Sequence, residues 1–472
     1  MNSNQIIEKV CKAIDALITS GEKYNGLFPS MIDRDSNEMI MEFTPLNDGQ
    51  REHDRTFLGS NLMHDHVVLK TIYAIGNVLN KKNYIEAADK YLKYFVSHCT
   101  NTVTGLFPWG EHAYWHLLED KAAAGQDLKP DSTGGSKLVH DHLNQAPLWL
   151  WEKLYEFNPN VVIRFAKGLD MHWKSKHPYE YNRHAYINIK EPFKMKKTYW
   201  ADFPRHGGFY IFDWAFAYRK TRDKEFYDQI ITMLDYIPAS KDKNGLLSYA
   251  TNSIGRDELL KAPAQTLSLA ASMLEAAEIL YESNLELSIR LQKEAGEYLN
   301  GFFSVPHDND EDVYVLSCRP ETYEITGTMP IWSSKYGVPP AAYSGLICNC
   351  CYRITKDKRL LDYAKSVAIS YVKKDFPDSL GIPALVCGLV LGLFADLYEI
   401  SGEQNWLSEG LKLADIAIKV YLDKDLPRCA TGIDIYESQM LPGFLLNGLA
   451  RIALLSENRI NCGIEPDYSY RQ

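Results

Sequence analysis

A helical unit of about 40 residues recurs along this 472-residue sequence and restricts its possible folds more than any other feature. Each unit has one helix, a short polar link, a second helix, and then a turn with glycine and aromatic residues. The clearest links read Thr-Arg-Asp-Lys at 221–224, Thr-Lys-Asp-Lys at 355–358 and Ser-Gly-Glu-Gln at 401–404. Self-similarity at this period predicts a stack of helical hairpins.

The spacing of apolar residues predicts hairpins at 62–80 with 84–99, 146–157 with 160–173, 209–220 with 224–237, 265–283 with 285–303, 341–354 with 357–373, and 386–400 with 404–420. An open solenoid would carry a polar capping repeat at each end. Here the last helix, 441–456, is apolar and can pair with the amphipathic helix at 4–19. We therefore predict an all-α fold, an α/α toroid of six to seven hairpins that forms one catalytic domain over 1–472, with short strands at 186–189 and 313–316.

The net charge of −10 disfavours a nucleic-acid partner, and an anionic substrate would need a local basic pocket or a metal. The 30 tyrosines and 9 tryptophans suit either sugar stacking or a large helical core. No run of 18 apolar residues is apparent, so we expect no membrane partner. Nine scattered cysteines and no evident signal peptide predict reduced thiols and a cytoplasmic location.

Three long connections, 105–145, 174–207 and 304–340, hold most of the chemically interesting residues. Two imidazoles and a carboxylate, from His112, Asp141 and His184, suit a divalent metal. Arg183, beside His184, has a fork that binds a carboxylate through two hydrogen bonds. The alternatives are ordinary histidines, a helix-capping aspartate and a surface arginine.

Two further patches are candidate substrate sites. The segment 199–210 combines polar groups with Gly207 and Gly208, which allow a ligand close to the backbone. The segment 318–332 offers a cation and an aromatic ring for sugar contacts. A helix entry and a solvated loop salt bridge are the structural alternatives. The substrate-binding candidates are Tyr199, Asp202, Arg205, Arg319, Trp332 and Trp109, and His206 is a catalytic candidate.

Three short motifs resemble those of family 2 pectate lyases: Gly-Glu-His at 110–112, His-Asp-His-Leu-Asn-Gln-Ala-Pro at 140–147, and Arg-His at 183–184. The resemblance implies an α/α toroid of seven hairpins. It also implies a divalent metal (Mn, Zn, Ni or Ca) on His112, Asp141 and His184, with Arg183 as the base. Asp141 stands where the family has Glu, and Glu111 adds an acid beside the first ligand, so the preferred substrate can differ from pectate.

The resemblance implies metal-assisted β-elimination on a small uronate-containing oligosaccharide. Because arginine is normally locked in its charged form, Arg183 acts either as a base with a lowered pKa or as a carboxylate clamp. Tyr186, Tyr199 and His206 are alternative bases. A glycoside hydrolase that pairs carboxylates from Glu111, Asp141 and Asp202 is the main rival. A sugar epimerase and a non-catalytic scaffold are further alternatives.

Overall fold

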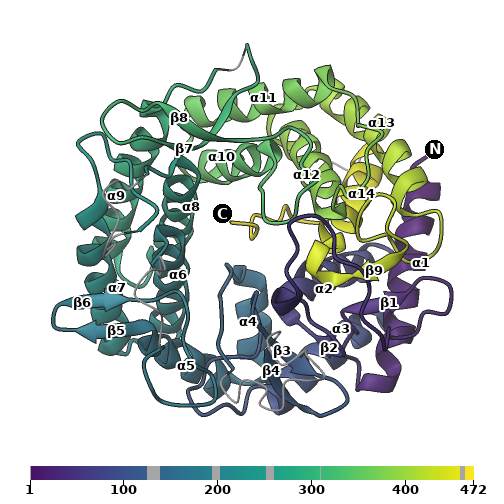
Figure 1. The fold of residues 1–472 in the computed structure, drawn as a ribbon, viewed down its shortest axis with the longest axis horizontal. Coiled ribbons are helices and arrows are strands. Elements are labelled where there is room, and N and C mark those ends of the chain that lie inside the picture. The colour runs from purple at the N-terminus through teal and green to yellow at the C-terminus, as the bar shows by residue number, and fades with distance from the viewer. Residues whose placement is uncertain are drawn as a thin grey trace.

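The helices form a ring of hairpins around a central space (Figure 1). The structure is a computed structural model that describes residues 2–124, 139–193, 202–250, 260–308, 310–457 and 463–471. The helices are α1 Ser3–Gly21, α2 Leu62–Val78, α3 Lys82–Tyr94, α4 Leu148–Phe157, α5 Pro159–Gly168, α6 Pro204–Thr221, α7 Lys224–Tyr236, α8 Pro263–Leu280, α9 Leu285–Ser304, α10 Ala341–Thr355, α11 Lys358–Lys373, α12 Ala384–Ser401, α13 Gln404–Tyr421 and α14 Pro442–Ser456. The predicted toroid is confirmed, and the predicted helix boundaries lie within five residues of those in the structure, the largest differences being at the ends of α3 and α5 and the start of α6.

The first and last helices close the ring, as the sequence predicted. Helix α14 packs against α1 on its outer side and lies between α12 and α2. A second contact ties the two ends of the sequence together, because strand β1 (Met31–Asp33) pairs antiparallel with β9 (Ile435–Glu437). The ring is therefore closed by contacts between residues that are about as far apart in the sequence as they can be.

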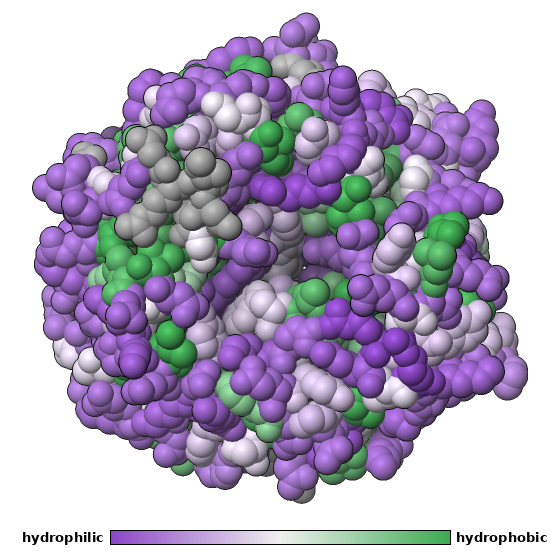
Figure 2. Space-filling view, turned by 180° about the vertical axis from the view of Figure 1, so that it is seen from behind, coloured by the Kyte–Doolittle hydropathy of each residue, from purple (hydrophilic) through white to green (hydrophobic). Residues whose placement is uncertain are grey.

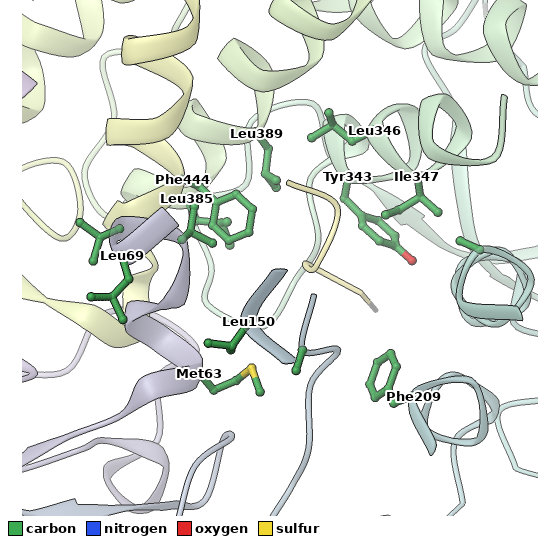
Figure 3. Close-up of a cluster of buried hydrophobic side chains, with 14 of the residues drawn as sticks. Met63, Leu69, Leu150, Phe209, Tyr343, Leu346, Ile347, Leu385, Leu389 and Phe444 are labelled. Atoms are coloured by element: carbon green, nitrogen blue, oxygen red, sulfur yellow. The ribbon is translucent and has the colours of Figure 1, made fainter. Parts of the chain in front are cut away.

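The inner and outer helices differ in how much of their surface is buried. Sixteen of the 18 residues of α8 are buried, against eight of the 20 in its outer partner α9. An inner helix meets its own partner and both neighbours, whereas an outer helix presents one face to water, so only the outer helices are amphipathic. Apolar side chains from the inner helices gather around the ring centre (Figure 3), among them Met63, Leu150, Phe209, Tyr343 and Phe444.

The repeated links form the same turn three times. Arg222, Lys356 and Gly402 end their helices in the left-handed conformation, with φ of 61°, 60° and 71°. The following acid then begins the next helix, and its backbone N–H donates to the Ser or Thr two residues earlier, at 3.1 to 3.3 Å. Two of these acids, Asp223 and Asp357, also cap the new helix with their side chains.

The remaining strands lie in the long connections. They form one sheet of β2 (Gly59–Ser60), β3 (Ala113–His116) and β4 (Lys121–Ala124), and two hairpins, β5 (Trp173–Lys176) with β6 (Tyr179–Tyr181) and β7 (Tyr314–Cys318) with β8 (Ile325–Met329). The strand predicted at 313–316 is thus present, shifted by one residue. The strand predicted at 186–189 is not formed, and only Tyr186 makes an isolated bridge, to His140.

One helix departs from the expectation that no long apolar run exists. Helix α12 is long and apolar enough to cross a membrane by length and composition alone, but 78% of that stretch is buried inside the structure. Its contacts with α10, α13 and α14 account for its apolar character, because it needs an apolar surface on nearly every side.

Candidate active site

Three distant backbone segments meet at one edge of the ring. The middle segment, 139–142, pairs on one side with Gly110 and on the other with Tyr186. The backbone N–H of Glu111 donates to the His142 carbonyl at 2.9 Å, and that of Asp141 donates to the Ala185 carbonyl at 3.0 Å. Gly110 permits the close approach, since it has φ of 96° and a Cβ there would lie 2.4 Å from the His142 oxygen.

The extended backbone conformation of the middle segment determines which of its side chains point toward the site. Successive side chains along an extended backbone point in opposite directions, so His140 and His142 share one side and Asp141 points to the other. The rings of His140 and His142 both lie 4.9 to 5.3 Å from those of His112 and His184. With His206, whose ring stacks on His142 at 5.0 Å, these residues form the histidine cluster: His112, His140, His142, His184 and His206.

Three members of the cluster can hold a metal ion. One nitrogen each from His112, His142 and His184 lies within 4.8 Å of the others. The Nδ1–H of His184 donates to the Asp141 carbonyl at 3.0 Å, and His112 Nδ1 faces Asp54 Oδ1 at 3.2 Å. The His184 contact leaves the Nε2 lone pair of that ring available, which is the usual arrangement for metal-ligating histidines, whereas His112 Nε2 lies 3.2 Å from His142 Nδ1. The buried Nε2 of His142 has no hydrogen-bond partner among the described residues, which also fits a ligand.

Asp141 was the predicted carboxylate ligand, and the structure places it elsewhere. Its Oδ1 accepts a hydrogen bond from the Ala185 N–H at 2.8 Å, and its Oδ2 lies 3.2 Å from His172 Nε2. The carboxylate is buried on the side of its segment opposite His142. Asp141 therefore fixes the position of the 184–185 backbone, and His142 takes its place in the possible metal-binding group.

Burial keeps the imidazoles of His142, His184 and His206 neutral, which is the state that metal ligation requires of a histidine. It lowers the pKa of His142 to about 3 and holds those of His184 and His206 well below the usual value. Glu111 makes a short contact with Nδ1 of the neutral His142 ring, whose N–H donates to the carboxylate. Burial alone would raise the pKa of Glu111, but His142, His112 and Arg205 outweigh it and keep the carboxyl ionised.

Two arginines stand beside the cluster and share one aromatic ring. The guanidinium carbons of Arg183 and Arg205 lie 4.4 and 5.1 Å from the Phe203 ring centroid. Burial, and then the charge of Arg205, lower the pKa of Arg183 to about 10. At pH 7 roughly one Arg183 side chain in a thousand is then neutral, far more than for an ordinary arginine.

A cavity of about 510 Å³ opens in front of these groups. Its described lining carries five cationic side chains: Arg51, Arg183, Arg205, Lys335 and Arg471. Glu111 is the only carboxylate in that described lining. The local basic pocket that an anionic substrate requires is thus present, although the whole chain is acidic.

The other predicted substrate residues divide into those at the cavity and those away from it. Arg205 lines the cavity, whereas Trp109 is 1% exposed and packs in the core against Phe107 and Trp151. Asp202 is buried and accepts a hydrogen bond from the Tyr236 hydroxyl at 2.7 Å. Tyr199 lies outside the described residues.

The predicted site residues on the 304–340 connection also lie away from the cavity. Arg319 pairs with Glu324 at 3.1 Å on the β7–β8 hairpin, which is the solvated salt bridge considered as its alternative. Trp332 donates to the Lys374 carbonyl at 3.1 Å and packs edge-on against Tyr371. Neither residue belongs to the described lining of the cavity, because local partners occupy both side chains.

Sequence reasoning missed several residues of the site. Asp54 contacts His112, and Arg51 holds Asp54 at 2.6 Å, from a loop far earlier in the chain. His142 was visible in the His-Asp-His pattern at 140–142, where an alternating backbone would have pointed to both histidines. The segment 469–471 also reaches the cavity, and no local pattern indicated that.

Comparison with known proteins supports the resemblance. Residues 44–238 match the family described as periplasmic pectate lyase. No curated protein matches the chain. Solved structures with similar folds include a sugar epimerase from a ruminal bacterium (12% identity, TM-score 0.49, covering 80% of this chain and 88% of that one). Another is a D-mannose isomerase (9% identity, TM-score 0.47, covering 95% of this chain and 97% of that one). A third is a family 76 mannosidase from Bacteroides thetaiotaomicron (12% identity, TM-score 0.44, covering 96% of this chain and 100% of that one).

The family match contradicts the predicted cytoplasmic location, because the matched family is described as periplasmic. Cysteine content misled the prediction for a physical reason. The cysteines in the described residues are buried, and burial raises the pKa of thiols such as those of Cys348 and Cys351. A thiol that stays protonated and inaccessible is inert, so it does not indicate a reducing compartment.

The matched residues contain the three motifs, the histidine cluster, Arg183 and Arg205. The match supports a carbohydrate-processing enzyme and leaves the choice between lyase and hydrolase open. The predicted resemblance is therefore confirmed, and over residues 44–238 this chain is similar to the periplasmic pectate lyase family.

Proposed function

We propose that this protein is a metal-dependent lyase that cleaves short uronate-containing oligosaccharides by β-elimination. One observation carries the proposal. The possible metal-binding group of His112, His142 and His184 reaches, through His142, a cavity that Arg183 also lines, and the described lining of this cavity carries five cationic side chains and one carboxylate. The cavity size falls within the range of about 300–1,000 Å³ that is typical for small-ligand sites, so a short oligosaccharide suits it.

The charge of the cavity favours an acidic sugar over a neutral one. A neutral glycan would leave the five cationic side chains of the described lining with Glu111 as their one carboxylate there, and partly desolvated cations in excess of anions cost free energy. A uronate carboxylate supplies that charge and can accept two parallel hydrogen bonds from either guanidinium. Burial, the first cause of the lowered pKa of Arg183, disfavours its charged form, and an anion bound beside it would favour that form.

The carboxylate inventory favours elimination over hydrolysis. A glycoside hydrolase of the usual kind needs two carboxyl groups flanking the scissile bond. Of the three candidates, Asp141 and Asp202 are turned into the protein and only Glu111 lies in the described cavity lining. Elimination needs no second carboxylate, because a base and a stabilised carbanion suffice.

The donor set fits a borderline transition metal. Three imidazoles suit zinc, nickel, copper or iron, whereas calcium and magnesium prefer oxygen ligands. Of the metals considered from the sequence, zinc and nickel fit this set best, and calcium fits least. When bound, the metal would withdraw electron density from the uronate carboxylate and acidify the proton on the adjacent ring carbon.

Substrate binding and proton removal would fall to side chains of the protein. Arg183 binds the carboxylate or, in its neutral form, removes the acidified ring proton. The electrons of that C–H bond form a C=C bond, the glycosidic C–O bond breaks, and the leaving oxygen takes a proton from solvent. Arg205 offers a second carboxylate contact. Glu111 holds His142 in place.

Product spectroscopy tests the reaction type. With oligogalacturonate, we expect near-ultraviolet absorbance from the conjugated unsaturated uronate to rise in step with new reducing ends. Elimination gives one chromophore for each bond cleaved, whereas hydrolysis gives reducing ends alone. Reducing ends without absorbance would establish a hydrolase and overturn the proposed mechanism. The same assay on a neutral oligosaccharide of equal length is the control for charge recognition.

A further inference from the structure

The segment after the last helix runs into the centre of the ring (Figure 1). We call residues 463–471 the inner segment. Lys70 of α2 donates to the Pro466 carbonyl at 2.7 Å, and His66 Nε2 bonds the Ser469 hydroxyl at 2.7 Å. The Tyr468 hydroxyl donates to Asp396 of α12 at 2.7 Å. The inner segment is thus anchored to inner helices on different sides of the ring.

Charge reinforces these anchors. Burial alone would raise the pKa of Asp467, but Lys70 and His66 outweigh it and keep the carboxyl ionised. At the far end of the segment, Arg471 is buried and pairs with Glu275 of α8. Buried ion pairs are costly to break one partner at a time. The segment is therefore held in a fixed position.

The inner segment lies between two cavities. Ser469 and Arg471 line both the substrate cavity and a second cavity of about 1230 Å³ on the other side of the segment. Tyr470 lines only the substrate cavity, and Tyr468 lines only the second one. Viewed from behind, the ring centre is hollowed (Figure 2).

Tyr470 is braced at this partition by aromatic rings. Its ring lies edge-on to Tyr343 of α10 at 5.7 Å and to Phe444 of α14 at 6.3 Å. Both of these residues point toward the ring centre (Figure 3). A rigid aromatic side chain with neighbours on two sides is a good barrier, because it cannot turn aside without losing packing.

We infer that the inner segment closes one end of the substrate cavity and that Tyr470 determines how much of a sugar chain can enter. This rests on the proposed function. A chain that enters from the open side stops at Tyr470, so a fixed number of sugar units lies between that stop and Arg183. Cleavage then releases a product of one dominant short length.

Product-length analysis of the Tyr470→Ala variant tests the inference. Digests of oligogalacturonates from trimer to octamer are separated by size. We expect one dominant short product from the wild type and a several-fold larger share of longer products from Tyr470→Ala. Tyr470→Phe keeps the ring and should keep the wild-type pattern. Tyr73→Phe, in the lining of the second cavity but not of the substrate cavity, is the matched control and should also keep it, and thermal unfolding of each variant checks its folding.

The outcomes separate the two claims. An active wild type whose product lengths match those of a folded Tyr470→Ala variant would overturn the role of Tyr470 and leave the proposed function intact. A change of product length in Tyr73→Phe equal to that in Tyr470→Ala would also overturn it, because Tyr73 lines the second cavity and not the substrate cavity. A wild type that cleaves no oligouronate would overturn the proposed function and this inference together.

Discussion

The Arg183→Lys variant is expected to lose about 10²–10³-fold in kcat/KM on an oligouronate, as when a single transition-state donor is removed. Lysine keeps the charge but has no fork for two parallel hydrogen bonds, and its flexible stem does not stack on Phe203 as a guanidinium does. The measurement is the initial rate of absorbance from the unsaturated product. Arg319→Lys is the matched control, because Arg319 pairs with Glu324 outside the cavity, and its rate should stay near that of the wild type.

The pH profile separates two roles for Arg183. Its pKa is lowered to about 10, so below pH 10 the neutral fraction increases about tenfold for each unit by which the pH is raised. If Arg183 removes the proton, kcat should rise with the same slope toward pH 10. A clamp that only binds the carboxylate needs the charged form and gives no such rise. Near-normal turnover in Arg183→Lys would contradict both roles.

The second large effect is expected at His142. The His142→Ala variant should purify without metal, because it loses one of the three imidazole ligands. The expected loss is larger than the roughly 10–100-fold loss of metal affinity that is typical when a residue that only hydrogen-bonds to a ligand is replaced. Asp141→Asn is the informative comparison. Asparagine keeps an oxygen that can accept the Ala185 N–H bond, so this variant should still bind metal. Elemental analysis of both purified variants gives the answer.

The two variants distinguish the structure from the family pattern. The sequence resemblance placed a carboxylate ligand at 141, whereas the structure directs that side chain toward His172. Metal retained by His142→Ala and lost by Asp141→Asn would show that Asp141 is the ligand. Circular dichroism and thermal unfolding of both variants are needed as controls, since Asp141 and His142 are buried.

The fold was predictable because its signals are local and repeated. The links at 221–224, 355–358 and 401–404 each carry the hydroxyl and acid that end one helix and begin the next. Ring closure was predictable from one further fact, the apolar face of the last helix. Each of these signals lies within a few residues or one helical period, where the sequence is most informative.

The site was only partly predictable because it depends on contacts between distant residues. His112, His184, Arg183 and Arg205 were identified from motifs, but the choice between Asp141 and His142 depends on backbone pairing with Gly110 and Tyr186. Aromatic residues misled the prediction for a related reason. A tryptophan such as Trp109 suits a core as well as a sugar site, and only its neighbours decide.

Metal removal and return tests the central claim most directly. The wild-type protein is treated with a chelator until elemental analysis finds no transition metal, and the absorbance assay is run before and after zinc or nickel is restored. We expect product formation to disappear with the metal and to return when one equivalent per chain is added. His142→Ala should not recover under the same treatment. Full activity in the metal-free protein would contradict the proposed mechanism.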